Sequence, residues 1–394
     1  FMVTLHKVVE FILNSETVQA HVPAGMLALD YLRQHKNLTG TKSGCKEGDC
    51  GACSVIIGEL KKDAIEYRPM TSCLLPMGEL HGKHLVTIEG LNMEHLSAVQ
   101  NAMVDCGGTQ CGYCTPGFVV CMTAGLMAPQ VPLNEEGVLY AISGNLCRCT
   151  GYQSIKDAGF QAIQSLRDRL INKERIKALV EAKALPTYFL GIAERLKAIE
   201  PDEILEMGLQ HRGRTIVAGG TDLYVQRGEQ LAESSITLLN NESEISPAIA
   251  SEGRVIIDAR MTFEAFATDP LIKTHLQEIY DYNLLMASWP IRTRSTIGGN
   301  LCNASPIADM TCLLLALECS LTLTSPDGHR RELPLNEFYL GYKQLNKEPD
   351  EVVTDISFPV FSKNAYVNWE KVSKRAWLDL SLIHISEPTR HASI

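Results

Sequence analysis

Thirteen cysteines stand in this chain of 394 residues, and eight of them fall in two groups of four within the first 150 residues. The N-terminal residues show no basic segment followed by an apolar stretch, which predicts no secretory signal and a cytoplasmic location. Disulfides are rare in that reducing compartment, so the two groups predict metal centres. The other five cysteines stand singly and are expected to be small core residues: Cys106, Cys121, Cys302, Cys312 and Cys319.

The first group has the spacing Cys45-x4-Cys50-x2-Cys53, with Cys73 downstream. This is the spacing of plant-type [2Fe–2S] sites. One loop must bend around the cluster and supply three sulfurs, and glycines allow both the bend and the approach of N–H groups to the bridging sulfides. The loop contains Gly44, Gly48 and Gly51. A four-cysteine zinc site is the alternative, but zinc sites usually consist of two short Cys-x2-Cys pairs.

The second group consists of two tight pairs, Cys111-x2-Cys114 and Cys147-x-Cys149. Taken alone, this spacing also fits zinc. Each pair is expected to stand at the start of a helix, where the helix dipole favours thiolate over thiol; Thr115 and Pro116 are expected to cap the first of these helices. This context favours a second [2Fe–2S] cluster held between helices, and the chain should then bind about four irons and four sulfides.

Nucleotide binding must use something other than a Rossmann turn or a P-loop, because neither motif occurs in the chain. Two glycine pairs stand out, in the strings IVAGGTDL at residues 216–223 and TIGGN at 296–300, the latter leading to ASPIAD at 304–309. Backbone without side chains lets pyrophosphate oxygens approach N–H groups closely. A plain tight turn is the alternative for either string taken alone.

Periodicity divides the chain into successive parts. Residues 1–84 are expected to be rich in strands, with strands over 8–13 and 53–57 and a helix over 27–34, and residues 85–170 to be helical. A charged, alanine-rich stretch at 171–185 is expected to be a linker, and alternating strands and helices from 186 to 381 indicate an α/β or α+β domain.

The cysteine strings GDCGAC at 48–53, GTQCGYCTPG at 108–117 and GNLCRCTGY at 144–152 resemble the xanthine oxidase family of molybdenum hydroxylases. The resemblance implies an α+β multidomain chain with a β-grasp ferredoxin-like domain, a four-helix [2Fe–2S] domain and a flavin domain of the non-Rossmann type found in that family. It implies that the helical-domain cluster is the one nearer the molybdenum pterin and places Gln110 beside the pterin, with a solvated glutamine as the alternative.

The resemblance also implies the cofactor-binding residues. It places residues 216–223 on the FAD pyrophosphate, Asp309 on the ribose or adenine side, and Lys371 near the flavin, with an ordinary surface lysine as the alternative for Lys371. The implied FAD set is Ile216, Val217, Ala218, Gly219, Gly220, Thr221, Asp222, Leu223, Thr296, Gly298, Gly299, Asn300, Ser305, Asp309 and Lys371; the implied cluster ligands are Cys45, Cys50, Cys53, Cys73, Cys111, Cys114, Cys147 and Cys149.

The function implied by the resemblance is electron transfer, with no catalytic side chain on this chain. A large subunit holding the molybdenum cofactor would oxidise hypoxanthine or xanthine to urate, and electrons would pass through both clusters to FAD and on to NAD+. The expected assembly is a heterotetramer or larger. Another substrate (an aldehyde, carbon monoxide, an aromatic acyl-CoA or an N-heterocycle) is the first alternative, and a zinc-binding protein without enzymatic activity is the second.

Composition excludes two classes of partner. A net charge of −10 without clusters of Lys and Arg argues against nucleic acid, and no apolar run approaches the length of about 20 residues that a membrane helix needs. The resemblance ends near Leu380, inside what should be a folded domain, and residues 382–394 show no periodicity. We therefore expect an incomplete flavin domain followed by a tail that does not belong to the family, the product of truncation or sequence assembly.

Overall fold

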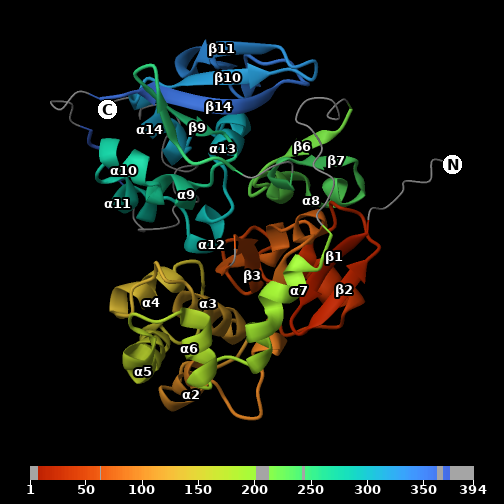
Figure 1. Cartoon of the computed structure of the whole chain (residues 1–394), viewed down its shortest axis with the longest axis vertical. Helices are drawn as coiled ribbons and strands as arrows, with labels where there is room; N and C mark the ends of the chain where they lie inside the picture. The colour runs from red at the N-terminus through yellow and green to blue at the C-terminus, as the bar shows by residue number, and fades with distance from the viewer. Residues whose placement is uncertain (1–7, 63, 201–212, 242–244, 362–366, 373–394) are drawn as a thin grey trace. The chain divides into compact units, whose positions relative to one another are not determined.

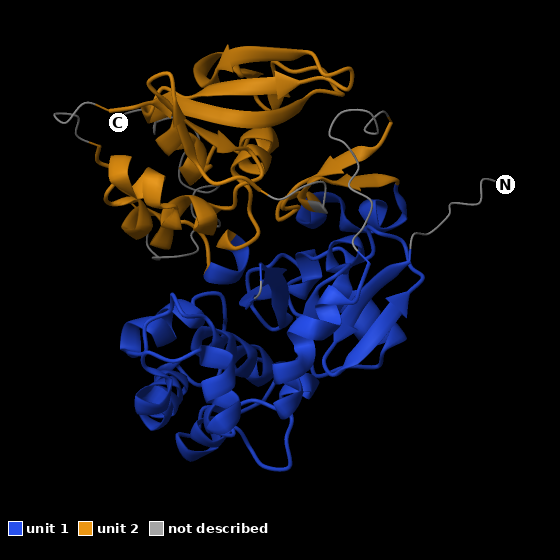
Figure 2. Cartoon of the chain, viewed as in Figure 1, with its two compact units in different colours: residues 1–203, 224–234, 289–291 blue, residues 204–223, 235–288, 292–394 orange. Residues whose placement is uncertain are grey.

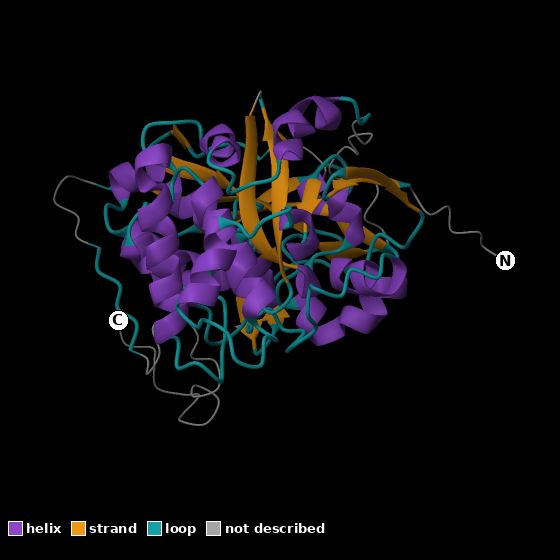
Figure 3. Cartoon of the chain, turned by 90° about the horizontal axis from the view of Figure 1, so that it is seen from below, coloured by secondary structure: helices purple, strands orange, loops and turns teal. Residues whose placement is uncertain are grey.

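The computed structural model describes residues 8–62, 64–200, 213–241, 245–361 and 367–372 (Figure 1). The tail expected at 382–394 lies outside these residues. The chain forms two compact units: unit 1 contains residues 1–203, 224–234 and 289–291, and unit 2 contains residues 204–223, 235–288 and 292–394 (Figure 2). Helices and strands both contribute substantially to the described chain, which confirms the α+β class (Figure 3). None of its helices combines the length and apolar character that a membrane span requires.

Unit 1 begins with a mixed five-stranded sheet in the order β2-β1-β5-β3-β4. The alternating side chains of β1 and β2 turn Phe11 and Val18 into its core, and Asn14 adopts a left-handed conformation in the hairpin turn. The helix expected over 27–34 is present as α1 (Ala28–Asp30), which continues as a π-helical turn, Tyr31–His35. The strands are β1 (Val9–Leu13), β2 (Glu16–Ala20), β3 (Ser54–Lys61), β4 (Ala64–Thr71) and β5 (His84–Val86).

His84 lies on β5 and is fully buried. Its Nε2 lies 2.8 Å from the carbonyl oxygen of Asn14, which can only accept, so Nε2 carries the proton. Its Nδ1 therefore accepts a hydrogen bond from the Tyr67 hydroxyl at 2.9 Å. Burial lowers the pKa of His84 to about 3, so the folded chain holds this ring neutral.

We expect the folded chain to lose stability as the pH falls below about 6.5, the ordinary histidine pKa. The unfolded chain then binds a proton that folded His84 refuses until about pH 3, so the stabilisation is complete above pH 6.5 and declines through that window. Between pH 7 and pH 5.5 the loss is about 1 kcal/mol. Melting temperatures measured at pH 7 and pH 5.5 should show this loss of stability in the wild type and not in His84→Gln. Replacing the exposed His21 by Gln should leave it unchanged, and a His84→Gln variant with the wild-type pH dependence would contradict the assignment.

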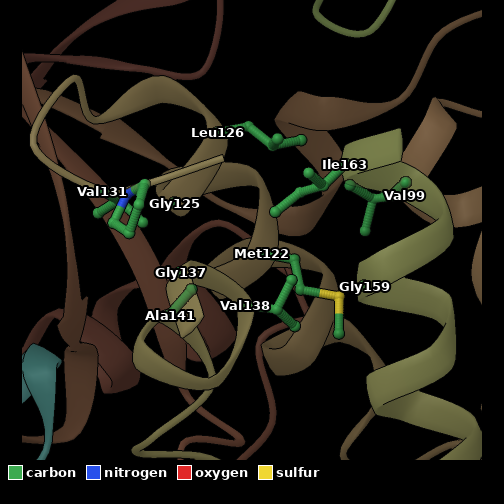
Figure 4. Close-up of a pocket in the computed structure, with 12 residues that line it drawn as sticks. Val99, Met122, Gly125, Leu126, Val131, Gly137, Val138, Ala141, Gly159 and Ile163 are labelled. Carbon is green, nitrogen blue, oxygen red and sulfur yellow. The ribbon is translucent and has the colours of Figure 1, made fainter. Parts of the chain in front are cut away.

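Four helices follow in unit 1: α2 (Ala98–Asp105), α3 (Thr115–Met127), α4 (Glu135–Ala141) and α5 (Gln153–Leu170). Helix α3 is buried over eleven of its thirteen residues and packs on α2, α4 and β3, which explains its apolar character on all sides. A Cβ at Gly159 of α5 would lie 2.4 Å from Val138 of α4, so glycine permits this close approach. Figure 4 shows the small apolar cavity that remains in this bundle, whose lining side chains offer no polar atom to a ligand.

The stretch expected to be a linker contains a packed helix, α6 (Arg175–Glu181), with Ala178 and Leu179 buried. A 3-10 turn (Thr187–Gly191) and α7 (Ile192–Lys197) follow. They return to the N-terminal part of unit 1, where Arg195 donates to the Ser15 carbonyl in the β1–β2 turn at 2.8 Å and Tyr188 donates to the Gly90 carbonyl in a 3-10 helix after β5 at 2.8 Å. This connection therefore contributes to the core of unit 1.

Unit 2 contains an antiparallel five-stranded sheet in the order β11-β10-β14-β9-β8. Its apolar face packs against helices, with Ile257, Leu321 and Ile356 among the fully buried side chains. The larger sheet is made of β8 (Ile249–Ser251), β9 (Arg254–Asp258), β10 (Ser320–Thr324), β11 (Arg330–Pro334) and β14 (Val352–Pro359); two smaller pairs are β6 (Thr215–Val217) with β7 (Ile236–Leu238), and β12 (Tyr339–Gly341) with β13 (Gln344–Leu345).

The described helices that lie wholly in unit 2 follow β9 and precede β10. Two further helices, α8 (Leu223–Glu233) and α12 (Trp289–Arg292), belong almost entirely to unit 1. Those wholly in unit 2 are α9 (Phe263–Thr268), α10 (Pro270–His275), α11 (Ile279–Leu284), α13 (Ile297–Asn303) and α14 (Asp309–Ala316).

Candidate functional site

The first cysteine group forms two sulfur pairs in unit 1. Cys45 hydrogen-bonds Cys50, and Cys53 hydrogen-bonds Cys73. The hydrogen bond from Cys50 and backbone N–H groups lower the pKa of Cys45 to about 5, and the same pairing raises the pKa of Cys50. A Cβ at Gly44 would lie 2.6 Å from the Cys50 sulfur, so a glycine is needed where the loop passes this close.

The second group also forms two pairs. The sulfurs of Cys111 and Cys149 lie 3.6 Å apart, and Cys114 hydrogen-bonds Cys147. Burial acts to raise the pKa of Cys147, but hydrogen bonds from Thr150 and from backbone N–H groups outweigh it and lower the pKa to about 7.

A helix start is expected to favour thiolate at both pairs, and the surroundings of Cys114 act against this effect. This residue directly precedes α3, yet burial and the neighbouring Cys147 raise its pKa to about 12. The expected cap is also absent: the N-cap is Cys114 itself, and the Thr115 hydroxyl hydrogen-bonds Thr109 at 2.8 Å. Pro116 does occupy the first turn.

The two-by-two pairing fits binuclear centres. Two thiolates bound tetrahedrally to one metal at about 2.3 Å lie about 3.8 Å apart, close to the separation of Cys111 and Cys149. Within the described ranges, no three His, Cys, Asp or Glu side chains converge on a point that could hold a single metal ion. A [2Fe–2S] cluster requires two thiolates per iron, whereas a tetrahedral zinc ion requires all four ligands at one point.

The two groups touch each other through hydrogen bonds. The Leu146 amide donates to the Cys50 carbonyl at 3.0 Å, the Asn145 side chain donates to the Gly51 carbonyl at 3.2 Å, and the Tyr113 hydroxyl donates to the Ser43 carbonyl at 2.6 Å. Asn145 and Tyr113 were not singled out by sequence reasoning, although both lie inside the cysteine strings. A polar side chain close to a cysteine in these strings is the sequence feature that could have identified both residues.

The single cysteines are not all core residues. Cys121 and Cys319 are buried as expected, whereas Cys312 is exposed and Cys106 and Cys302 are half-buried. Helix α14 turns Leu313 and Leu314 inward, which leaves Cys312 on its outer side. Gln110 is exposed, beside the exposed Cys111.

The two glycine strings meet in unit 2. A Cβ at Gly219 would lie 2.3 Å from the Arg294 carbonyl oxygen, and the Thr221 hydroxyl lies 3.0 Å from the Ser295 hydroxyl. Gly220 adopts φ +68°, which favours glycine at that turn. The first string begins in the last residues of β6, and the loop that contacts Arg294 starts at Ala218. Residues 75 positions apart are therefore neighbours.

In the second string, the backbone amides of the two glycines already donate hydrogen bonds within the protein. The Gly298 amide donates to the Ala259 carbonyl at 2.7 Å, and the Gly299 amide donates to the Thr296 hydroxyl at 3.2 Å, which caps α13. A Cβ at Gly298 would lie 2.8 Å from the Ala259 Cβ. These glycines allow close packing, and both amides are already bound to acceptors of the protein.

Lys371 is held in an ion pair. Its Nζ lies 2.7 Å from Asp309 and donates to the Leu285 carbonyl at 2.8 Å, and its side chain is 13% exposed. This excludes an ordinary surface lysine. Burial raises the pKa of Asp309, and Lys371 acts in the opposite direction. Asn300, from the second string, accepts a hydrogen bond from Thr311 at 3.2 Å, while the Ser305 hydroxyl accepts from the Ile307 amide at 3.4 Å.

Three sequence families match the chain in succession. Residues 11–77 match the 2Fe-2S iron-sulfur cluster binding domain, residues 87–159 match the [2Fe-2S] binding domain, and residues 194–361 match the FAD binding domain in molybdopterin dehydrogenase. These matches assign iron–sulfur and FAD domains to the chain. They follow one another along the sequence in the same order as the first cysteine group, the second cysteine group and the glycine strings.

Curated relatives match nearly the whole chain. Xanthine dehydrogenase of Dictyostelium discoideum is 27% identical over 95% of this chain and 33% of its own length. Xanthine dehydrogenase/oxidase of Mus musculus is 27% identical over 96% of this chain and 32% of its own length, and aldehyde oxidase 1 of Rattus norvegicus is equally similar over 95% of this chain. The chain thus spans about a third of the length of these relatives.

Solved structures of similar sequence include quinoline 2-oxidoreductase from Pseudomonas putida 86, 33% identical over 43% of this chain and 100% of that chain, with a TM-score of 0.37. Aldehyde oxidoreductase from Desulfovibrio gigas is 34% identical over 44% of this chain and 18% of that chain, with a TM-score of 0.36. At TM-scores this low, the likeness does not bear on the fold.

Proposed function

This chain belongs to the xanthine oxidase family of molybdenum hydroxylases, and we propose that it is the electron-transfer part of such an enzyme. A partner polypeptide with the molybdenum cofactor would oxidise the substrate and pass electrons to this chain, in an assembly of heterotetramer size or larger. Two [2Fe–2S] clusters and FAD, when bound, supply one-electron and two-electron chemistry. The chain's own residues hold, orient and shield them, and none acts as a general acid or base.

The observation that carries the proposal is the paired geometry of the cysteines. We assign Cys45 with Cys50 to one iron and Cys53 with Cys73 to the other; in the second group the pairs are Cys111 with Cys149 and Cys114 with Cys147. Cys111 and Cys149 are exposed, whereas Cys53 and Cys73 are buried. An electron donor on another polypeptide can therefore approach the second group more closely than the first.

The flavin is assigned to unit 2. The turn at Gly219 and Gly220 offers backbone donors to the pyrophosphate, and the residues around it extend the set across 216–223 and Thr296 to Asn300. The Asp309–Lys371 ion pair, with Ser305 nearby in sequence, would face the remainder of the cofactor. The ion pair with Lys371 counteracts the effect of burial on the pKa of Asp309 and would favour its charged form, which could meet polar groups of a bound ligand.

The proposed substrate is hypoxanthine or xanthine, with NAD+ as the final acceptor. Support comes from the names of the relatives that match over at least 92% of this chain, most of which are xanthine dehydrogenases. Aldehydes are the second candidate, because aldehyde oxidase 1 matches the chain equally well.

A reduction experiment tests the proposal. We expect the purified chain to be red-brown and to bleach with dithionite, because its chromophores accept electrons. Xanthine should bleach it only when the molybdenum-containing partner is present, and added NAD+ should restore the colour. Absorbance in the visible range measures both steps, with an aldehyde in place of xanthine to discriminate the two substrates. A colourless chain that contains zinc would overturn the proposal.

A further inference from the structure

The two cysteine groups are joined by a short path through main-chain atoms of unit 1. The Cys50 carbonyl accepts a hydrogen bond from the Leu146 amide at 3.0 Å, and Leu146 is covalently bonded to Cys147. From one sulfur to the other, the path consists only of atoms of Cys50, Leu146 and Cys147 and this one hydrogen bond. No other residue intervenes between a member of the first group and a member of the second.

Asn145 holds this path from the side. Its Nδ2 donates to the Gly51 carbonyl at 3.2 Å, one residue from the Cys50 carbonyl, and the residue is only 4% exposed. Ser54 already donates to the same Gly51 oxygen from its hydroxyl at 2.7 Å and from its amide at 3.1 Å. A carbonyl oxygen has two lone pairs, so Asn145 is not needed to satisfy it.

The Asn145 amide lies in the interior of unit 1, where its Oδ1 is buried and has no hydrogen-bond partner among the described residues. The hydrogen bond from its Nδ2 to the Gly51 carbonyl orients this amide against the loop that carries Cys50.

Gly117 makes the contact possible from the side of α3. A Cβ at this position would lie 2.2 Å from the Gly51 carbonyl oxygen and 3.2 Å from Asn145 Nδ2. No side chain fits there without moving the Gly51 loop away from α3. The absence of a side chain at Gly117 therefore fixes how closely the loop of the first group approaches the second.

We propose that the hydrogen bond from Leu146 to Cys50 is the electron path between the two cysteine groups, and that Asn145 and Gly117 are the positioning residues that maintain it. This rests on the proposed function, because it requires both groups to bind clusters. With clusters bound, one electron would leave an iron held by the second group and enter an iron held by the first, so that one is oxidised as the other is reduced. No bond would break and no proton would move; the partner's substrate would supply the electrons and the flavin would receive them.

Two variants of the full, cluster-loaded chain test the proposal. Asn145→Ala removes the amide, and Gly117→Ala inserts a methyl group against the Gly51 oxygen. Because Asn145→Ala removes one hydrogen bond from the loop, the Leu146 amide should exchange with solvent about fivefold faster. After flash photoreduction with one electron per chain, freeze-quench EPR should show slower redistribution of the electron between the two groups in both variants, and the magnetic splitting between the fully reduced groups should decrease.

Each variant has a matched control in the same bundle. Asn134→Ala removes the amide that caps α4, where Asn134 Oδ1 accepts from the Gly137 amide at 3.0 Å, away from both cysteine groups. Gly125→Ala adds a methyl group to α3 where it meets Ala141, with the Cβ atoms 2.8 Å apart. Both controls should lower stability and leave the electron redistribution rate at its wild-type value. This readout separates positioning from a purely structural role.

Slower redistribution in the fully loaded Asn145→Ala chain, beyond the change in either control, supports the proposal. If Gly117→Ala does not retain its iron, Asn145→Ala decides alone. A fully loaded Asn145→Ala chain with faster Leu146 exchange but wild-type redistribution would overturn this inference and leave the proposed function intact. A wild-type chain without iron would overturn both, which keeps the two failures distinct.

Discussion

Replacing Gly219 by Val should abolish FAD binding while the iron content stays the same. The first carbon of any side chain at this position would lie 2.3 Å from the Arg294 carbonyl oxygen and 3.1 Å from the Thr296 amide. The loop would have to move away from the second glycine string, and its backbone donors would no longer converge. Overpacking of this kind costs about 1–3 kcal/mol, which corresponds to a loss of flavin affinity of about 5- to 150-fold.

Flavin released by heat and measured by fluorescence, relative to iron in the same sample, gives the result directly. Gly228→Val is the matched control, because a Cβ at Gly228 would meet no atom within 4 Å and its backbone needs no special conformation. It should retain FAD at the wild-type ratio. Gly299→Val should also lose flavin, since its Cβ would lie 2.7 Å from the Thr296 hydroxyl that caps α13. Normal flavin content in both Gly219→Val and Gly299→Val would show that the flavin site lies elsewhere.

The second large effect is expected at the cysteines: Cys50→Ser should remove one cluster and leave the other. Each iron of a [2Fe–2S] cluster needs two thiolates, and Cys50 is the partner of Cys45. Iron should therefore fall from about four to about two atoms per chain. Cys149→Ser should remove the other cluster and leave the first, because Cys149 pairs with Cys111.

Iron and acid-labile sulfide, with the EPR signals of the reduced chain, measure the loss cluster by cluster. Cys312→Ser is the control, since this exposed cysteine belongs to neither group and should keep about four irons. The main-chain hydrogen bond from Leu146 to Cys50 does not depend on the Cys50 sulfur, so the second group should keep its shape in Cys50→Ser. Zinc in place of iron, or loss of both clusters from one substitution, would contradict the two-cluster assignment.

The sequence alone was sufficient for the class of fold and the kind of site. Alternation in β1 and β2, the apolar run of α3 and the spacing of the eight cysteines are properties of neighbouring residues, and local geometry follows from them. The sulfur pairing within the first group was not readable from spacing, because it depends on how the loop of Cys45 to Cys53 folds back onto Cys73.

Tertiary structure decided the features that depend on residues far apart. The sequence predicted a linker at 171–185, but packing buries Ala178 and Leu179 and makes it a helix of unit 1. Burial also raises the pKa of Cys114, while Cys312 lies on the exposed side of its helix. The meeting of Gly219 with Arg294, and of Gly51 with Asn145, exists only because the folded backbone brings these segments within van der Waals distance, which no local pattern encodes.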